Sequence, residues 1–85
     1  MMNLSWIKDE EVRDRVALDV LLCGNGYVVE EDDGTEQMRI APERMNVILD
    51  KKTRKPTAYI TELFGQKIRF EPEHVWHGKL AVEGE

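Results

Sequence analysis

Apolar residues near the start of the chain recur every three or four positions, which is the period of one face of an α-helix. The recurring positions are Val12, Val16, Val20 and Cys23. Asp9 and Ser5 are both suited to capping the first turn, because their side-chain oxygens can accept hydrogen bonds from free backbone amides. Residues 24–26 read Gly-Asn-Gly, and both residue types readily adopt the left-handed conformation that ends a helix. The pattern predicts a helix over about residues 9–23.

From residue 27 onward the apolar residues alternate with polar ones, which is the period of a β-strand with one buried face. Groups of turn-forming residues separate the alternating stretches. These groups are Asp-Asp-Gly at 32–34, Ala-Pro-Glu-Arg at 41–44, a polar loop at 51–56, Gly-Gln at 65–66 and Glu-Pro-Glu at 71–73. Short strands are predicted over residues 27–31, 35–40, 45–50, 57–64, 67–70 and 75–77.

These elements predict an α+β fold in which one N-terminal helix packs on an antiparallel meander sheet of five to six short strands. Residues 1–85 are expected to form a single domain, with the helix at about 9–23, the β-meander at about 27–77 and a frayed tail at 80–85. No internal repeat is apparent. The residues expected to form most of the core are Val12, Val16, Val20, Leu21, Tyr27, Val29, Met38, Ile40, Val47, Leu49, Tyr59, Ile68 and Phe70.

Length and charge narrow the classes of function. The chain has 85 residues, enough for one small core, and 17 Asp and Glu residues against 12 Lys and Arg residues give a net charge of −5. A free duplex-binding domain normally has the opposite balance, because phosphate neutralisation supplies much of its affinity. The basic cluster at 51–55 is interpreted as a solvated hairpin tip, and contact with a phosphate backbone is the less favoured alternative.

The sequence also limits the compartment. A single cysteine, Cys23, excludes an internal disulfide and a cysteine zinc cluster, and it favours a reducing, cytosolic compartment. The longest apolar run, Val20–Cys23, is too short for a transmembrane helix. Residues 1–7 lack the basic and apolar regions of a signal peptide. No membrane association is expected.

Few residues offer catalytic or metal-binding chemistry. Cys23 lies at the end of the predicted helix on its apolar side, where a thiol behaves as a small hydrophobe. His74 and His77 form an H-x-x-H pair, but residues three apart on a strand point to opposite faces and do not easily share a metal ion. A helical turn across residues 72–77 would restore that geometry, so a metal site stays a minor alternative. No catalytic residue, cofactor or metal is therefore predicted, and an enzymatic function is disfavoured.

The aromatic residues are expected to lie in the core and at its rim rather than to form a face that binds single-stranded nucleic acid. Trp6 and Ile7 precede the clean helical repeat, and Trp76 lies where the chain continues beyond the last strand. We expect these three residues to contact a neighbouring subunit, because aromatic residues are enriched in the centres of interfaces. Weak self-association of the isolated chain is the expected consequence.

Three stretches, in this order, resemble motifs of the portal (connector) protein family of tailed bacteriophages. Residues 19–29 are similar to the family's passage from an aliphatic helix end through Gly-Asn and a small residue to Tyr. Residues 39–47 resemble its corner with Pro, an acidic residue and a basic residue followed by a strand. Residues 68–77 resemble its ending with Phe, Pro-Glu, Val and His. Together the motifs span about residues 19–80.

The resemblance implies that the chain is a piece of a longer subunit, similar to part of the outer wing domain. Portal subunits assemble as a ring, usually dodecameric, at one vertex of the capsid, and DNA is packaged and ejected through it. The implied partners are other portal subunits, the capsid, and terminase or tail-connector proteins, with DNA met only by passage through the full ring. The implied location is the virion, and the host cytoplasm during assembly. No catalytic residue follows from the resemblance.

A second hypothesis needs no resemblance. The same small sheet without an active site suits a free-standing β-rich adaptor that binds a peptide along an exposed strand edge. The sequence does not separate this hypothesis from the portal hypothesis, because both predict a non-catalytic module that works by protein–protein contacts.

Overall fold

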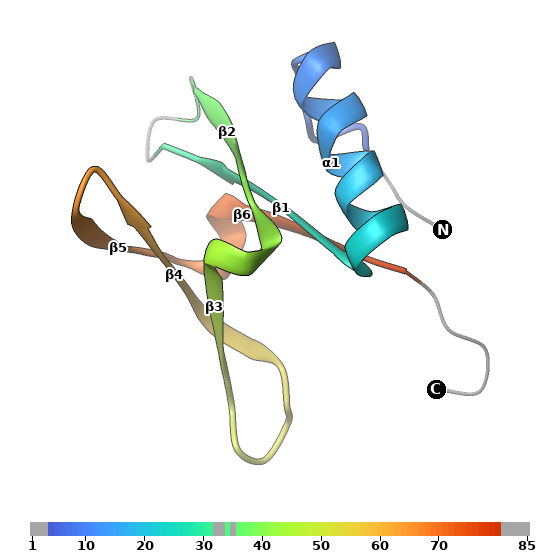
Figure 1. Ribbon diagram of the computed structural model, residues 1–85. Helices are drawn as coiled ribbons and strands as arrows, with labels where there is room; N and C mark the ends of the chain where they lie inside the picture. Colours follow the sequence, from blue (N-terminus) through green and yellow to red (C-terminus); the bar gives the residue numbers. More distant parts are fainter. Residues whose placement is uncertain (1–3, 32–33, 35, 81–85) are drawn as a thin grey trace.

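A computed structural model of the chain describes residues 4–31, 34 and 36–80. Among these residues it contains one α-helix, six strands and two single-turn 3₁₀ helices (Figure 1). In chain order the elements are α1 (Glu10–Cys23), β1 (Asn25–Glu30), β2 (Gln37–Ile40), η1 (Pro42–Arg44), β3 (Met45–Leu49), β4 (Pro56–Leu63), β5 (Gln66–Phe70), η2 (Pro72–His74) and β6 (Val75–Lys79). The predicted α+β fold with an N-terminal helix is confirmed.

The described strands form two antiparallel three-stranded sheets, where the sequence predicts a single meander. Sheet A has the strand order β2-β1-β6, and sheet B has the order β3-β4-β5. Turn η1 separates the two sheets, because Pro42 lacks an amide hydrogen and cannot continue the ladder from β2 into β3. After η2 the chain returns to the first strand, so that β6 pairs with β1 from Asn25↔Lys79 to Val29↔Val75.

Both ends of α1 are capped by residues at the positions that the sequence indicates. At the start, Asp9 Oδ1 accepts hydrogen bonds from the backbone amides of Glu11 and Val12 at 2.8 and 3.2 Å. At the end, Gly24 has a φ of 82°, and its amide donates to the carbonyl of Val20 at 3.0 Å. Asp9 is thus the N-cap of the helix.

The two sheets are built from two copies of one structural unit, which corrects the expectation that the chain has no internal repeat. Each unit is a β-hairpin, a 3₁₀ turn that begins with Pro-Glu, and a third strand: β1-β2-η1-β3, then β4-β5-η2-β6. The registers agree, because Tyr27 pairs with Ile40 in the first hairpin and Tyr59 pairs with Phe70 in the second. Each central strand also pairs with the third strand of the other unit. The two units are therefore intertwined.

Strand β1 is buried on both faces, and each face belongs to a different core. On one face, Tyr27 and Val29 lie in the core between the two sheets. The buried residues of that intersheet core are Tyr27, Val29, Ile40, Met45 and Tyr59. On the other face, Val28 packs with Val16 of α1 and with Ile7. A strand with both faces buried explains why residues 27–29 are apolar without interruption.

Helix α1 lies directly on the backbone of β1 at Gly26. A Cβ atom at this position would lie 2.7 Å from Val16 Cγ2 and 2.8 Å from Val20 Cγ2, which is too close for carbon atoms. The buried carboxylate of Asp19 fixes the helix to β2, because it accepts two hydrogen bonds from Arg39 at 2.6 and 2.7 Å. This pair raises the pKa of the Arg39 guanidinium above its ordinary value. Packing on β1 and a bidentate ion pair to β2 together hold α1.

Three residues predicted for the core are exposed instead. Leu21 follows Val20 by one position, so it is rotated by about 100° away from the face that packs on the sheet. Met38 lies on the edge strand β2 of sheet A. Leu49 comes after a register shift between Ile48 and Leu49 at the end of β3. For these residues, spacing along the chain was not sufficient evidence of burial.

The remaining core predictions agree with the structure. The residues that are buried as predicted are Val16, Val20, Tyr27, Val29, Ile40 and Tyr59. Those that are half-buried are Val12, Val47, Ile68 and Phe70. The buried apolar residues that the sequence argument missed are Ile7, Val28, Met45 and Ala58.

Three predicted features extend outside the described residues. The residues that are not described are Asp32 and Asp33 of the predicted hairpin turn, Thr35 at the start of the predicted strand 35–40, and residues 81–85 of the predicted tail. The described residue Leu80 donates its amide to the carbonyl of Gly24 at 3.0 Å. Within the described part of the chain, no helix is both long enough and apolar enough to cross a membrane.

We expect Val16→Asp to lower the free energy of unfolding by about 3 kcal/mol or more, because it places an unpaired charge in a fully buried site. The matched control is Leu18→Asp, the same introduced residue on the exposed side of α1, which we expect to cost less than about 1 kcal/mol. Urea unfolding at neutral pH compares the two variants. Equal losses for both would contradict the packing of α1 on β1.

Candidate functional site

A cluster of polar and aromatic side chains lies where the two structural units meet. Tyr27 and Tyr59 occupy equivalent positions in the two units, and their rings are 6.2 Å apart in an edge-to-face arrangement. His77 of β6 stacks on Tyr27 with ring centroids 4.5 Å apart. Its Nδ1 lies 3.1 Å from the Tyr59 hydroxyl, and its Nε2 lies 3.0 Å from Asn25 Oδ1. Both ring nitrogens therefore have partners within the fold.

Burial favours a neutral imidazole at His77, and the two contacts then determine which nitrogen carries the hydrogen. The carbonyl oxygen of Asn25 can only accept, so Nε2 carries the hydrogen, and Nδ1 accepts from the Tyr59 hydroxyl. Burial, with the positive charge of Lys79 as a smaller contribution, lowers the pKa of His77 to about 4. Burial also raises the pKa of both tyrosines. An imidazole with both nitrogens occupied acts here as a cross-link between β1, β4 and β6.

His74 lies in a different environment from His77. It belongs to η2, and its Nδ1 is 3.6 Å from Glu30 Oε1 at the end of β1. Among the residues that the structure describes, no group of three or more His, Cys, Asp or Glu side chains could hold a metal ion. Cys23 is exposed, because the last turn of α1 leaves it outside the core, so the expectation of a thiol packed as a small hydrophobe was wrong.

The proposed contact residues Trp6, Ile7 and Trp76 belong to the core under α1. Ile7 is only 1% exposed, which overturns its assignment to a subunit contact. Trp6 and Trp76 are half-buried and pack against the cluster formed by Ile7, Val16 and Val28. The side chain of Gln37 holds this N-terminal segment on β2, because it accepts from the amide of Lys8 at 2.8 Å and donates to the carbonyl of Trp6 at 2.9 Å.

Residues that precede the helix are therefore part of the fold. The helical spacing did not include them, and their contacts depend on β2 and β6, which lie far away in the sequence.

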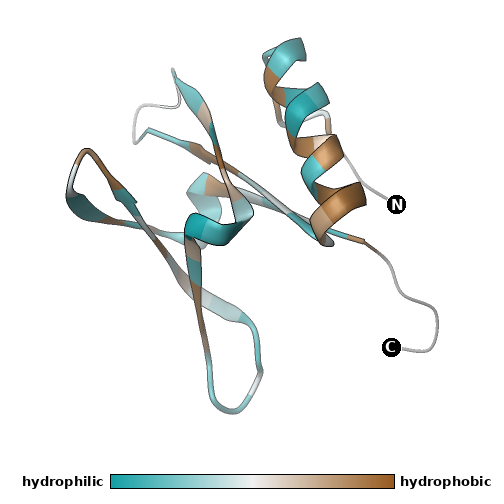
Figure 2. Ribbon diagram, viewed as in Figure 1, coloured by the Kyte–Doolittle hydropathy of each residue, from teal (hydrophilic) through white to brown (hydrophobic). Residues whose placement is uncertain are grey.

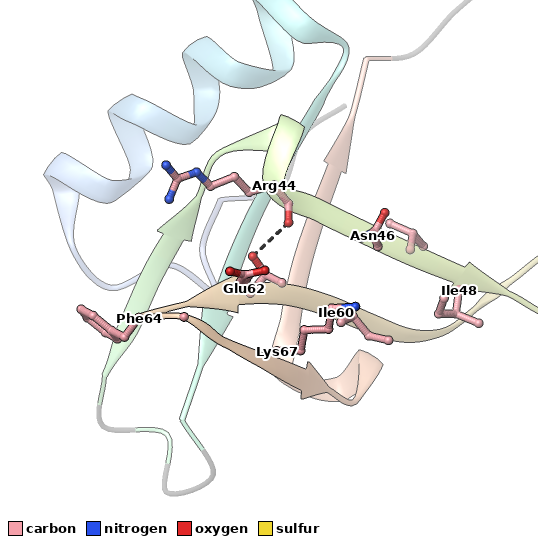
Figure 3. A pocket seen from close by; sticks show the side chains of 10 residues that line it. Arg44, Asn46, Ile48, Ile60, Glu62, Phe64 and Lys67 are labelled. Carbon is pink, nitrogen blue, oxygen red and sulfur yellow. Dashed lines mark hydrogen bonds between the residues drawn. The ribbon is translucent and has the colours of Figure 1, made fainter.

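The outer face of sheet B carries a hollow of about 690 Å³. Strands β3, β4 and β5 line it, and Figure 3 shows the side chains around it. Its apolar floor includes Ile48 and Ile60, and its rim includes the charged side chains of Arg44, Glu62 and Lys67. The carbonyl of Arg44 accepts a hydrogen bond from the Thr61 hydroxyl at 3.0 Å, which ties the start of β3 to β4.

Phe64 stands at one end of this hollow and is 98% exposed. It forms the two-residue turn between β4 and β5 with Gly65, one position earlier in the chain than the Gly-Gln turn predicted from the sequence. Both residues have positive φ, 52° and 77°. Hairpin turns of this kind favour Asn or Gly, whereas a bulky aromatic residue is strained there. The backbone conformation of Phe64 is thus strained, and its apolar ring is exposed to water.

Phe64 also borders a second hollow, of about 640 Å³, on the other side of the hairpin. This groove runs between the edge strands β2 and β5, with Met38, Ile68 and Phe70 among its apolar lining. Figure 2 shows the apolar tip of the β4–β5 hairpin standing apart from the apolar last turns of α1. Sequence reasoning missed Phe64 because it assigned the residue to a strand; its place directly before a turn glycine was the signal available.

Comparisons with protein-family models, with curated proteins and with solved structures found no match to this chain. Two features of the described residues stand out: the cluster of His77, Tyr27 and Tyr59, and the exposed hairpin tip at Phe64 beside the outer face of sheet B. The histidine and tyrosine cluster is enclosed and its hydrogen bonds are made within the fold. The hairpin tip and the outer face of sheet B are open to solvent.

The depressed pKa of His77 predicts a pH-dependent loss of stability. Unfolding restores an ordinary pKa of 6.5, so the unfolded state binds the proton first as the pH falls. We expect the free energy of unfolding to fall between pH 6.5 and about 4, by about 1–2 kcal/mol after allowance for the solvent that reaches the half-buried ring.

Urea unfolding across this pH range measures the effect as the difference between the wild type and His77→Gln, in which position 77 does not titrate. A wild-type minus His77→Gln difference that stays constant with pH would show that His77 is not held neutral.

Proposed function

We propose that this chain is a non-catalytic structural module that works through protein–protein contacts. The observation that carries the proposal is Phe64, an aromatic side chain held in solvent at the tip of a hairpin in a strained backbone conformation. The hollow beside it on sheet B adds the apolar residues Ile48 and Ile60 to the same surface.

A contact with another protein would explain why this turn contains Phe64. Asn or Gly at this position would relieve the positive φ and remove an exposed ring, at no loss of packing within the chain. Large aromatic residues contribute most to binding when they enter a pocket of a partner at the centre of an interface. The exposed ring therefore contributes to an interface and not to the fold.

The more specific proposal is that the module is part of the wing of a phage portal ring. Its support is the order of the three motifs, two of which contain the η1 and η2 turns that join the hairpins to their third strands. On this proposal the partners are other portal subunits, the capsid, and terminase or tail-connector proteins. The module would work at the portal vertex of the virion and in the host cytoplasm during assembly.

The alternative is a free-standing adaptor. Its support is the groove of about 640 Å³ between the edge strands β2 and β5, where an extended peptide would find both unpaired backbone groups and apolar side chains. Both proposals use a protein contact and neither assigns a catalytic residue.

We expect Phe64→Asn to raise the free energy of unfolding, by about 0.5–1 kcal/mol, because Asn tolerates the positive φ of this turn. Urea unfolding measures the change, and Leu63→Asn, one residue earlier and packed against the intersheet core, is the matched control that should be destabilised. A destabilised Phe64→Asn would show that the ring serves the fold, and the contact proposal would lose its support.

The portal proposal predicts ring-shaped particles from the complete reading frame that encodes this chain. Negative-stain electron microscopy of the purified product would show them, because the proposed ring is built from copies of one subunit. A product that remains a small particle at all concentrations would contradict the portal proposal and favour the adaptor.

A further inference from the structure

The two sheets have equivalent strand arrangements, but a helix packs on only one of them. Helix α1 packs on sheet A at β1 and β2, whereas no α-helix among the described residues lies over sheet B (Figure 1). The equivalent surface of sheet B, beside β4, carries the hollow of about 690 Å³. By the internal repeat, this surface of sheet B corresponds to the surface of sheet A on which α1 packs.

The equivalence extends to single residues. Val28 of β1 pairs with Arg39 of β2, and Ile60 of β4 pairs with Arg69 of β5 in the same register. Arg39 binds Asp19 of α1 through two short hydrogen bonds. Its equivalent, Arg69, makes only a 3.4 Å contact with Glu71 and is largely exposed. Sheet B thus has an apolar residue and an arginine at the positions that hold α1 on sheet A.

Helix α1 has a second apolar face that sheet A does not use. Leu18, Leu21 and Leu22 are all exposed, and Leu22 is 80% exposed. Glu11 and Asp14 precede Leu18 by seven and four positions, so they lie on the same side of the helix. Arg15 lies three positions before Leu18 and seven before Leu22, so it is on the same side. This leucine face, consisting of Glu11, Asp14, Arg15, Leu18, Leu21 and Leu22, has a charged half with a net charge of −1 and an apolar half.

We propose that the leucine face of one copy packs into the hollow of sheet B on a second copy. This inference rests on the proposed contact function and names its partner. The leucines would cover Ile48 and Ile60, and the charged half would lie toward Arg44, Glu62 and Lys67 (Figure 3). Both surfaces belong to the same chain, and each offers what the other lacks.

The charges of the two surfaces are complementary. Glu11, Asp14 and Arg15 give the helix face a net charge of −1, whereas Arg44, Lys67 and Glu62 give the hollow a net charge of +1. Opposite charges at the rim of an interface speed association and fix its orientation more than they add affinity. The contact should therefore weaken at high salt.

Because the two surfaces differ, the contact joins copies head to tail. After the first contact the pair keeps one free helix face, on one copy, and one free hollow, on the other, so copies can add further into a chain or a closed ring. One helix face is small beside a standard interface of about 1,600 Å², so a single contact is weak.

Sedimentation velocity of the whole chain over a concentration series tests the proposal. We expect the sedimentation coefficient of the wild type to rise with concentration. The helix variant Leu18→Lys/Leu22→Lys and the sheet variant Ile48→Lys should each associate at least about tenfold more weakly, because each lacks one surface. An equimolar mixture of the two variants should form a dimer and no larger species, because one intact helix face meets one intact hollow.

Met38→Lys is the matched control, because it changes an exposed apolar residue in the other groove and should leave association unchanged. Circular dichroism verifies that each variant is folded. A wild type that associates while the mixture of variants stays monomeric would overturn the head-to-tail contact, and so would loss of association in Met38→Lys.

Failure of the proposed contact between copies can be distinguished from failure of the proposed function. A wild type that is monomeric at every concentration, with a Phe64→Asn variant that is more stable, overturns only the contact between copies. A destabilised Phe64→Asn variant removes the support for the proposed function, whereas the mixing experiment still decides whether copies contact each other.

Discussion

The pairing of β1 with β6 is the interaction on which the rest of the structure depends. It joins residues about fifty positions apart along five register pairs, from Asn25↔Lys79 to Val29↔Val75. Without it, β1 and β2 would form a two-stranded hairpin, which is marginally stable in water by itself. With it, sheet A has three strands, β1 becomes a central strand, and His77 reaches Tyr27 and Tyr59 in the intersheet core.

Burial of β1 on both faces follows from this pairing and decides where α1 lies. One face closes the core between the sheets, and the other presents Gly26 and Val28 to the helix. The missing Cβ at Gly26 lets the valines of α1 approach the backbone. The same arrangement leaves the equivalent face of sheet B open, because only the first unit is preceded by a helix in the described chain.

The proposed contacts depend on the open face of sheet B and on the strained turn at Phe64. The polar side chains of Asn25, Tyr59 and His77 hydrogen-bond to one another, so they stabilise the fold without offering a reactive group to solvent. Phe64 and the exposed leucines of α1 have no such role within the chain. Among the exposed large apolar residues, Leu18, Leu21 and Leu22 lie together on α1, and Ile48 and Phe64 line the hollow on sheet B.

The sequence by itself determined the local elements and the fold class. Helix α1 begins after its N-cap Asp9 and ends before its C-cap Gly24, and the two Pro-Glu turns interrupt the strands. These features could be predicted because helix capping and the missing amide hydrogen of proline act over only a few residues. Tertiary structure decided the division into two sheets, the burial of Ile7 and the exposure of Leu21. It also decided that His77 meets Tyr59 and that Phe64 stands in solvent. These outcomes depend on which distant strands pair. The pairing of β1 with β6 leaves no periodic signal in either segment. The hydrophobic period of a strand shows which of its faces is buried, but it does not show which other strand it pairs with.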